Sequence, residues 1–199
     1  MTSATADITF EAESHTYWYG MEAIPSVSEV LRPLTEQYLA AIPEGILNWK
    51  RDLGIAVHKA CELFDLGTLD ETGLDERIVP YLEEYKTFLV DCRPEWKAIE
   101  SVVFEPDARY AGTLDRAGTV NGHPTIIDIK TSNAIQPTAA IQLWAYALAY
   151  DEMGVHDLCV LQLTGKGKYH LKTFTDYDLY YDTWNALLAL RRWNKETGK

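Results

Sequence analysis

Two apolar segments in the middle of the chain contain charged residues where a buried strand normally has none. The segment 110–116 contains Asp115, and the segment 126–132 contains Asp128 and Lys130. Residues two apart on a strand project from the same face. Asp128 and Lys130 are therefore expected to share one face of a strand.

An Asn121-Gly122 pair separates the two segments and predicts a tight hairpin turn, which would bring Asp115 toward Asp128 across the strand pair. Two carboxylates beside an ammonium group suit phosphodiester hydrolysis, because Mg²⁺ and Mn²⁺ prefer carboxylate oxygens. Such a metal polarises the phosphate and lowers the pKa of a water, while Lys130 positions that water or offsets transition-state charge. For Asp128 and Lys130 alone, an ordinary ion pair on a solvated strand face remains the alternative.

Two further pairs lie on expected helices, one before and one after these strands. His58 and Glu62 are one turn apart, so they can face a metal together. Gln142 and Tyr146 have the same spacing on the helix after Asp128. Taken alone, the first pair also fits a histidine with no role in chemistry, and the second fits the polar edge of an amphipathic helix.

In this order, the motifs resemble the RecB-like branch of the PD-(D/E)XK nuclease superfamily, and its small phage-type exonucleases in particular. They read Gly54…His58, Gly112-Thr113-Leu114-Asp115, Asp128-Ile129-Lys130 and Gln142-Leu143-Trp144-Ala145-Tyr146. The opening segment 17–34, with its Ile-Pro-Ser-Val-Ser-Glu-Val-Leu core, is similar to the same group. The resemblance spans residues 15–165.

The resemblance implies a role for each matching residue. Asp115 and Asp128 would bind Mg²⁺ or Mn²⁺ together with the backbone carbonyl of Ile129. His58 would complete or tune the metal shell, and Lys130 would orient or activate the attacking water.

Other residues would support this centre. The resemblance implies that Gln142 and Tyr146 hold the active centre or contact DNA. Glu100 matches an acidic position near the metal, Glu105 competes with it for that place, and Glu62 is a further candidate.

The resemblance implies a divalent-metal-dependent deoxyribonuclease, an exonuclease of phage-like recombination or DNA processing, with DNA and a single-strand annealing or recombination protein as partners. One alternative is a catalytically inactive nuclease-fold module that binds DNA ends or a recombination partner. Another is a carboxylate-rich metal hydrolase for a different substrate, which gives Gln142 and Tyr146 no role. Strand preference, polarity and oligomeric state stay open.

Composition limits these functions. The 199 residues are 47% hydrophobic and 24% charged, as in a soluble globular protein, and the net charge of −12 disfavours tight, non-specific DNA binding. A bound metal would reverse the field of a carboxylate site. No run approaches the ~20 apolar residues of a membrane span, and the N-terminus lacks the features of a secretion signal. We therefore expect no membrane association and a cytoplasmic location, in a bacterium or a phage-infected cell.

Cys61, Cys92 and Cys159 are far apart and lack zinc or iron–sulfur spacing, so we expect buried thiols and no iron–sulfur cluster. Two lysines, Lys166 and Lys168, alternate with glycines at 165–168. We interpret this segment first as a hairpin tip and second as a phosphate contact.

The expected fold is α/β, a restriction-endonuclease-like central mixed sheet flanked by helices, in a single nuclease domain over 1–199. Its parts would be an N-terminal hairpin and short helix (1–35), a helical part (36–92), the catalytic sheet and helix (93–175) and a C-terminal helix (176–199). The expected helices are a short one after a Ser26/Glu29 capping box, then 49–66, 76–91, 137–153 and 176–193; the expected strands are 99–104, 110–120, 124–131, 158–163 and 169–174.

Overall fold

The computed structural model describes residues 8–151 and 156–198. A five-stranded sheet forms its centre, in the order β4-β5-β6-β7-β8. The strands are β4 (Glu95–Glu105), β5 (Tyr110–Val120), β6 (His123–Lys130), β7 (Asp157–Gln162) and β8 (His170–Phe174). Neighbours are antiparallel except β6 and β7, which are parallel and joined through helix α5 (Thr138–Tyr150). The sheet is therefore mixed.

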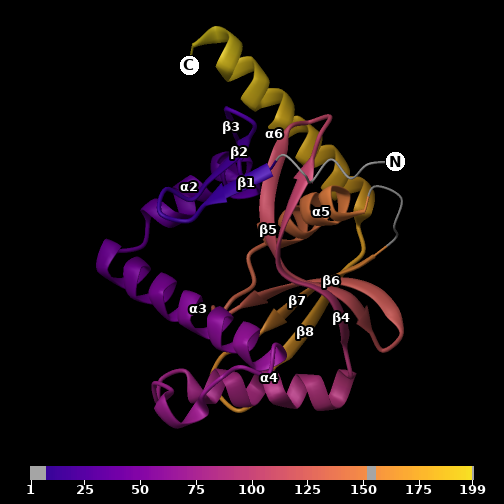
Figure 1. Cartoon of the computed structure of the whole chain (residues 1–199). Helices are drawn as coiled ribbons and strands as arrows, with labels where there is room; N and C mark the ends of the chain where they lie inside the picture. The colour runs from indigo at the N-terminus through magenta and orange to yellow at the C-terminus, as the bar shows by residue number, and fades with distance from the viewer. Residues whose placement is uncertain (1–7, 152–155, 199) are drawn as a thin grey trace.

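Helices cover both faces of this sheet (Figure 1). Helices α1 (Val27–Val30), α5 and α6 (Tyr177–Thr197) contribute to one buried apolar cluster, and α3 (Glu44–Asp65) and α4 (Val79–Cys92) contribute to the other. A short 3₁₀ turn, η2 (Glu71–Gly73), lies between α3 and α4. The predicted α/β class, with a central mixed sheet flanked by helices, is confirmed.

Strand β6 shows which residues face which helices. Ile126 packs in the α5–α6 cluster, whereas Ile127 and Ile129 pack in the α3–α4 cluster. Because side chains alternate along a strand, Asp128 and Lys130 lie on the α5 face. The predicted common face is thus present. The predicted hairpin turn before β6 is also present, since Asn121 and Gly122 both adopt positive φ, at 51° and 82°.

The N-terminal segment forms more than the expected hairpin. It is a three-stranded antiparallel sheet of β1 (Ile8–Glu11), β2 (Thr16–Tyr19) and β3 (Glu22–Ile24). The extra turn precedes β2, where His15 adopts a φ of +50°. The predicted capping box is present: Ser26 and Glu29 bond reciprocally at the start of α1.

Two helix starts differ from the prediction, and one helix was not expected. Helix α2 (Arg32–Ala40) was not expected, and none of its residues is buried, so no core-facing pattern marks it. Helix α3 begins at Glu44 rather than residue 49, directly after Pro43. Helix α4 begins at Val79 rather than residue 76. Pro80 lies in its first turn, where a backbone N–H has no partner within the helix, so proline loses no hydrogen bond there.

Other boundaries shift by a few residues. Strand β4 begins at Glu95 rather than residue 99, and α6 continues to Thr197. The expected end of α5 near 153–154 lies outside the described residues. All three cysteines are free and buried, as predicted. No helix in the described part of the chain is long and apolar enough to cross a membrane.

Candidate metal centre

The site begins where the β5–β6 ladder ends. The last paired residues are Arg116 and Ile127. Beyond them the backbone N–H of Ile129 donates to Asp115 Oδ2 at 2.6 Å. The buried carboxylate of Asp115 is therefore hydrogen-bonded to the backbone of β6. The structure thus places Asp115 beside β6, as the hairpin predicted.

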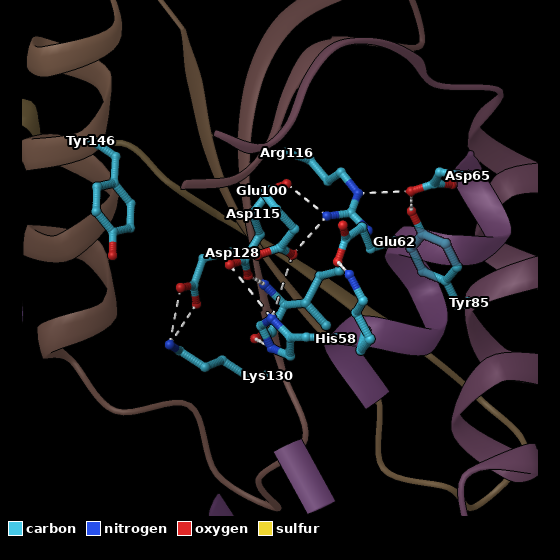
Figure 2. A network of polar contacts seen from close by, with 12 residues as sticks. His58, Glu62, Asp65, Tyr85, Glu100, Asp115, Arg116, Asp128, Lys130 and Tyr146 are labelled. Carbon is cyan, nitrogen blue, oxygen red and sulfur yellow. Dashed lines mark hydrogen bonds and ion pairs between the residues drawn. The ribbon is translucent and has the colours of Figure 1, made fainter. Parts of the chain in front are cut away.

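On the α5 face, Asp128, Lys130, Gln142 and Tyr146 form a chain of polar contacts. Lys130 Nζ donates to Asp128 Oδ1 at 3.0 Å and to Gln142 Oε1 at 3.2 Å. Gln142 Nε2 then donates to the Tyr146 hydroxyl at 3.0 Å. Figure 2 shows Lys130 reaching Asp128 while Tyr146 projects from α5. The helix that follows β6 therefore fixes the lysine through a side-chain amide.

A glycine makes room for this helix. A Cβ built on Gly112 would lie only 2.5 Å from Tyr146 Cε1 and 3.2 Å from Val27 Cγ2. Any larger residue at 112 would displace the tyrosine ring. This close approach gives a physical reason for the glycine in the Gly-x-x-Asp motif.

On the opposite face, His58 of α3 points at Asp115 in the middle of β5. Its Nδ1 lies 3.5 Å from Asp115 Oδ1 and 3.9 Å from Glu100 Oε1. Its Nε2 lies 2.9 Å from the Ile129 carbonyl, which can only accept a hydrogen bond. Nε2 therefore carries a proton, and Nδ1 faces the two carboxylates. The carbonyl predicted as a metal ligand is bonded to His58 in this structure.

His58, Glu100 and Asp115 each offer a ligand atom, and these atoms lie within 4.8 Å of one another. Asp128 lies beside this cluster: its carboxylate is buried, and Lys130 Nζ lies 3.0 Å from Oδ1 and 2.9 Å from Oδ2. Carboxylate and imidazole donors in such a cluster suit a divalent cation. The residues present therefore fit a metal ion.

Bringing these ionisable side chains together in a partly buried site shifts their pKa values. Burial raises the pKa of Asp128 to about 6, against the opposing effect of Lys130. Burial and the charge of Asp115 raise the pKa of Glu100 to about 7. Burial lowers the pKa of His58, but Asp115 and Glu100 outweigh it and raise that pKa to about 9. The cluster thus holds protons that a cation can replace.

Sequence reasoning missed a buried arginine network behind the cluster. Arg116 is fully buried and donates to Glu100 Oε1 at 2.9 Å and to Asp65 Oδ2 at 2.7 Å. The Tyr85 hydroxyl donates to the same Asp65 oxygen at 2.6 Å. Figure 2 shows this network on the α3–α4 side of the sheet. A signal was present, since Asp65 lies two helical turns after His58 and Arg116 interrupts an apolar strand.

Glu100 itself has an unusual backbone. Its φ is +44°, a left-handed conformation that is rare for a residue other than glycine. Such strain is found most often at functional sites. The structure therefore brings Glu100, predicted as a supporting residue, into the ligand cluster.

Two predicted acidic candidates lie outside the cluster. Glu62 pairs with Lys59 at 2.8 Å. Glu105 accepts backbone hydrogen bonds from Asp107 and Ala108 and so caps the β4–β5 turn. Neither belongs to the ligand cluster found in the described part of the chain.

The glycine–lysine turn 165–168 is held from within. Glu84 of α4 is buried, and its carboxylate accepts backbone N–H bonds from four residues at 2.7–3.1 Å: Thr164, Lys166, Gly167 and Lys168. The Lys166 side chain donates to Asn133 Oδ1 at 3.1 Å. These contacts support the hairpin-tip interpretation over a phosphate contact.

No family model and no curated protein matches the chain. Among solved structures, the crystal structure of LHK-Exo in complex with dAMP covers 88% of this chain and 89% of its own, with a TM-score of 0.49 and 11% sequence identity. A likeness at this level assigns no role to any residue. The function must be argued from the site itself.

Proposed function

We propose that the chain is a divalent-metal-dependent deoxyribonuclease and, more narrowly, an exonuclease of phage-like recombination or DNA processing. The observation that carries the proposal is the position of Lys130 at the end of β6. Its ammonium group is held between Asp128 and Gln142, beside a partly buried cluster that fits a cation. The exonuclease and recombination parts rest on the motif resemblance alone.

The metal would be Mg²⁺ or Mn²⁺, held by Asp115 and Asp128 with His58 and Glu100 close by. When bound, such a cation polarises a scissile phosphate and lowers the pKa of a water. The Asp128 carboxylate has the Lys130 ammonium as its one hydrogen-bond donor among the described residues, so a cation could bind beside it or take the place of that ammonium.

Lys130 would act directly on the reacting groups. Its ammonium lies 2.9 and 3.0 Å from the two Asp128 oxygens and 3.2 Å from Gln142 Oε1. With a cation on Asp128, an N–H donor of Lys130 would turn to the attacking water or to a phosphate oxygen as charge develops. One third of the Lys130 side chain is exposed, so a substrate can reach it. Gln142, itself bonded to Tyr146, would keep the lysine in place.

Cleavage of end-labelled and internally labelled DNA, single- and double-stranded, tests the proposal with Mg²⁺, Mn²⁺ and EDTA. We expect metal-dependent cleavage that is lost in Asp128→Asn and Lys130→Gln. Glu105→Gln is the matched control, because it neutralises a carboxylate outside the cluster. Internal cuts would reject the exonuclease part. DNA binding without cleavage under any divalent metal would favour the inactive DNA-end-binding module.

A further inference from the structure

Arg116 connects the ligand cluster to a carboxylate outside it. Its Nη1 donates to Glu100 Oε1 at 2.9 Å, and its Nε donates to Asp65 Oδ2 at 2.7 Å. Figure 2 shows the guanidinium between these two acidic side chains. One fully buried positive charge is therefore shared by a candidate metal ligand and by a residue on the far side of the arginine.

Asp65 lies at an unfavourable place for a buried carboxylate. It is the last residue of α3, and the C-terminal end of a helix carries partial negative charge. The last turn of α3 reads Cys-Glu-Leu-Phe-Asp, without a basic residue. The Asp65 side chain is nevertheless only 4% exposed. Its burial is therefore offset by Arg116 of β5 and not by its own helix.

A tyrosine of α4 modifies this contact. The Tyr85 hydroxyl donates at 2.6 Å to Asp65 Oδ2, the same oxygen that accepts from Arg116 Nε. The Tyr85 side chain is buried, so water does not replace this bond. A charge-assisted hydrogen bond is stronger when its acceptor carries more charge. Because two donors share the charge of one oxygen, Tyr85 weakens the hold of Asp65 on Arg116.

Arg116 has two opposing effects on Glu100. It fixes the Glu100 carboxylate beside His58 and Asp115, but it also competes with a cation for the negative charge of that carboxylate. If Asp65 takes a larger share of the guanidinium charge, Glu100 keeps more of its own charge for the cation. The affinity of the cluster for a cation should therefore depend on the contact between Arg116 and Asp65.

We propose that Asp65 and Tyr85 are positioning residues that set the cation affinity of the cluster through Arg116. Asp65 draws the guanidinium toward itself and leaves Glu100 available, whereas Tyr85 limits that effect. Neither residue would touch the cation or the substrate. This inference rests on the proposed metal-dependent function and adds to it a control of metal affinity from the α3–α4 side of the sheet.

Calorimetric titration of the metal-free full chain with Mn²⁺, in the absence of DNA, tests the inference. Asp65→Asn keeps the shape of the side chain but removes its charge, so Glu100 bears more of the Arg116 charge. We expect the Kd for Mn²⁺ to rise about tenfold, as for other residues that hold metal ligands in position. Tyr85→Phe removes one hydroxyl and changes no charge. We expect it to bind Mn²⁺ roughly threefold more tightly, the size of effect that one hydrogen bond produces.

Two further variants separate this effect from a general change in charge or stability. Glu62→Gln neutralises another carboxylate of α3, which pairs with Lys59 instead of Arg116, and should bind Mn²⁺ like the wild type. In the double variant of Asp65→Asn and Tyr85→Phe, the tyrosine change should lose its effect, because that effect passes through the Asp65 charge. Thermal melts in EDTA identify any variant that does not fold. Tyr85→Phe keeps every charge and remains informative if Asp65→Asn unfolds.

Unchanged or weaker Mn²⁺ binding in Tyr85→Phe would overturn the inference. A loss in Asp65→Asn no larger than the loss in Glu62→Gln would also overturn it, since the cause would then be the net charge alone. The two proposals fail separately. The expected changes in Mn²⁺ affinity without DNA cleavage by the wild type would reject the nuclease. Metal-dependent cleavage with equal Mn²⁺ affinity in all the variants would reject the role of Asp65 and Tyr85.

Discussion

Glu84 and Asp128 are buried to the same extent, each 2% exposed, but their surroundings differ. Glu84 accepts four backbone N–H bonds and closes the turn after β7. Both Asp128 oxygens lie within 3.0 Å of the Lys130 ammonium, and no backbone donor among the described residues reaches them. The first carboxylate is held by the backbone of the fold. The second is held by one lysine side chain that is one third exposed, so a cation can compete for it.

Two carboxylates that are equally buried can therefore have different roles. A buried carboxylate that is paired with a single ammonium group recovers only part of its desolvation cost. Burial raises the pKa of Asp128 to about 6, which is a stability cost borne at neutral pH. A cation beside that carboxylate would lower this cost. The groups that hold a buried carboxylate therefore say more about its role than its burial does.

The largest effect is expected for Asp128→Asn. This isosteric change removes the charge that would bind the cation, so DNA cleavage should fall on the order of a thousandfold. The melting temperature should stay close to wild type, because Lys130 is one third exposed and can be solvated. Kinetics and thermal melts on the same preparation check both parts. A variant that unfolds would place Asp128 with Glu84 as a structural residue.

Glu84→Gln should do the reverse. Its amide keeps one acceptor oxygen but directs an N–H₂ group at backbone donors, at a cost of about 2–3 kcal/mol. For a chain of this length the melting temperature should drop by roughly 5–10 °C. Cleavage measured well below that temperature should change less than about tenfold. A large activity loss without a change in melting temperature would show that the turn has a direct role in the site.

The sequence predicted the parts of the site that lie on regular strands. Asp128 and Lys130 fall on one face because strand alternation is strict, and Asn121-Gly122 fixed the hairpin that carries Asp115. Strands β5 and β6 were predicted almost to the residue for the same reason. Local patterns are sufficient wherever one element sets the position of a side chain.

Contacts between distant segments were not predictable in this way. Arg116 meets an aspartate 51 positions away, and Glu84 meets a turn 80 positions away. No local periodicity encodes such pairs. Helix α2 escaped prediction for a related reason: it has no buried face, and its apolar stripe faces a groove instead of the core.

Arg116→Lys tests whether Arg116 holds the metal ligands in position or only stabilises the fold. Arg116 bonds both to Glu100, which belongs to the ligand cluster, and to Asp65, which lies outside it. Lysine keeps the charge but cannot donate to both carboxylates from one planar fork. We expect metal affinity to fall by about tenfold, as for other residues that hold metal ligands in position. Mn²⁺ titration by calorimetry measures this. A drop in melting temperature with unchanged Mn²⁺ affinity would make Arg116 structural only.

The smallest effect concerns pH and metal removal. Without metal, the pKa values of Glu100 and Asp128, about 7 and about 6, lie above their unfolded values of 4.5 and 3.8. The folded state therefore binds more protons, and its stability falls as pH rises through this window. His58 acts in the same direction, because its pKa of about 9 exceeds 6.5 and its stabilisation is lost as pH rises toward that value.

Metal binding should oppose this trend, because a cation takes the place of the protons. The gain in melting temperature on adding Mn²⁺ to EDTA-treated protein should be a few degrees larger above pH 7 than below pH 6. Asp115, whose pKa is lowered because His58 and Lys130 outweigh its burial, is charged across this range and does not change the sign. Glu84→Gln should keep the pH-dependent gain, since its carboxylate lies outside the ligand cluster, and Asp128→Asn should lose most of it. If both variants kept the gain equally, the cation would bind elsewhere, and the burial of Asp128 would need another explanation.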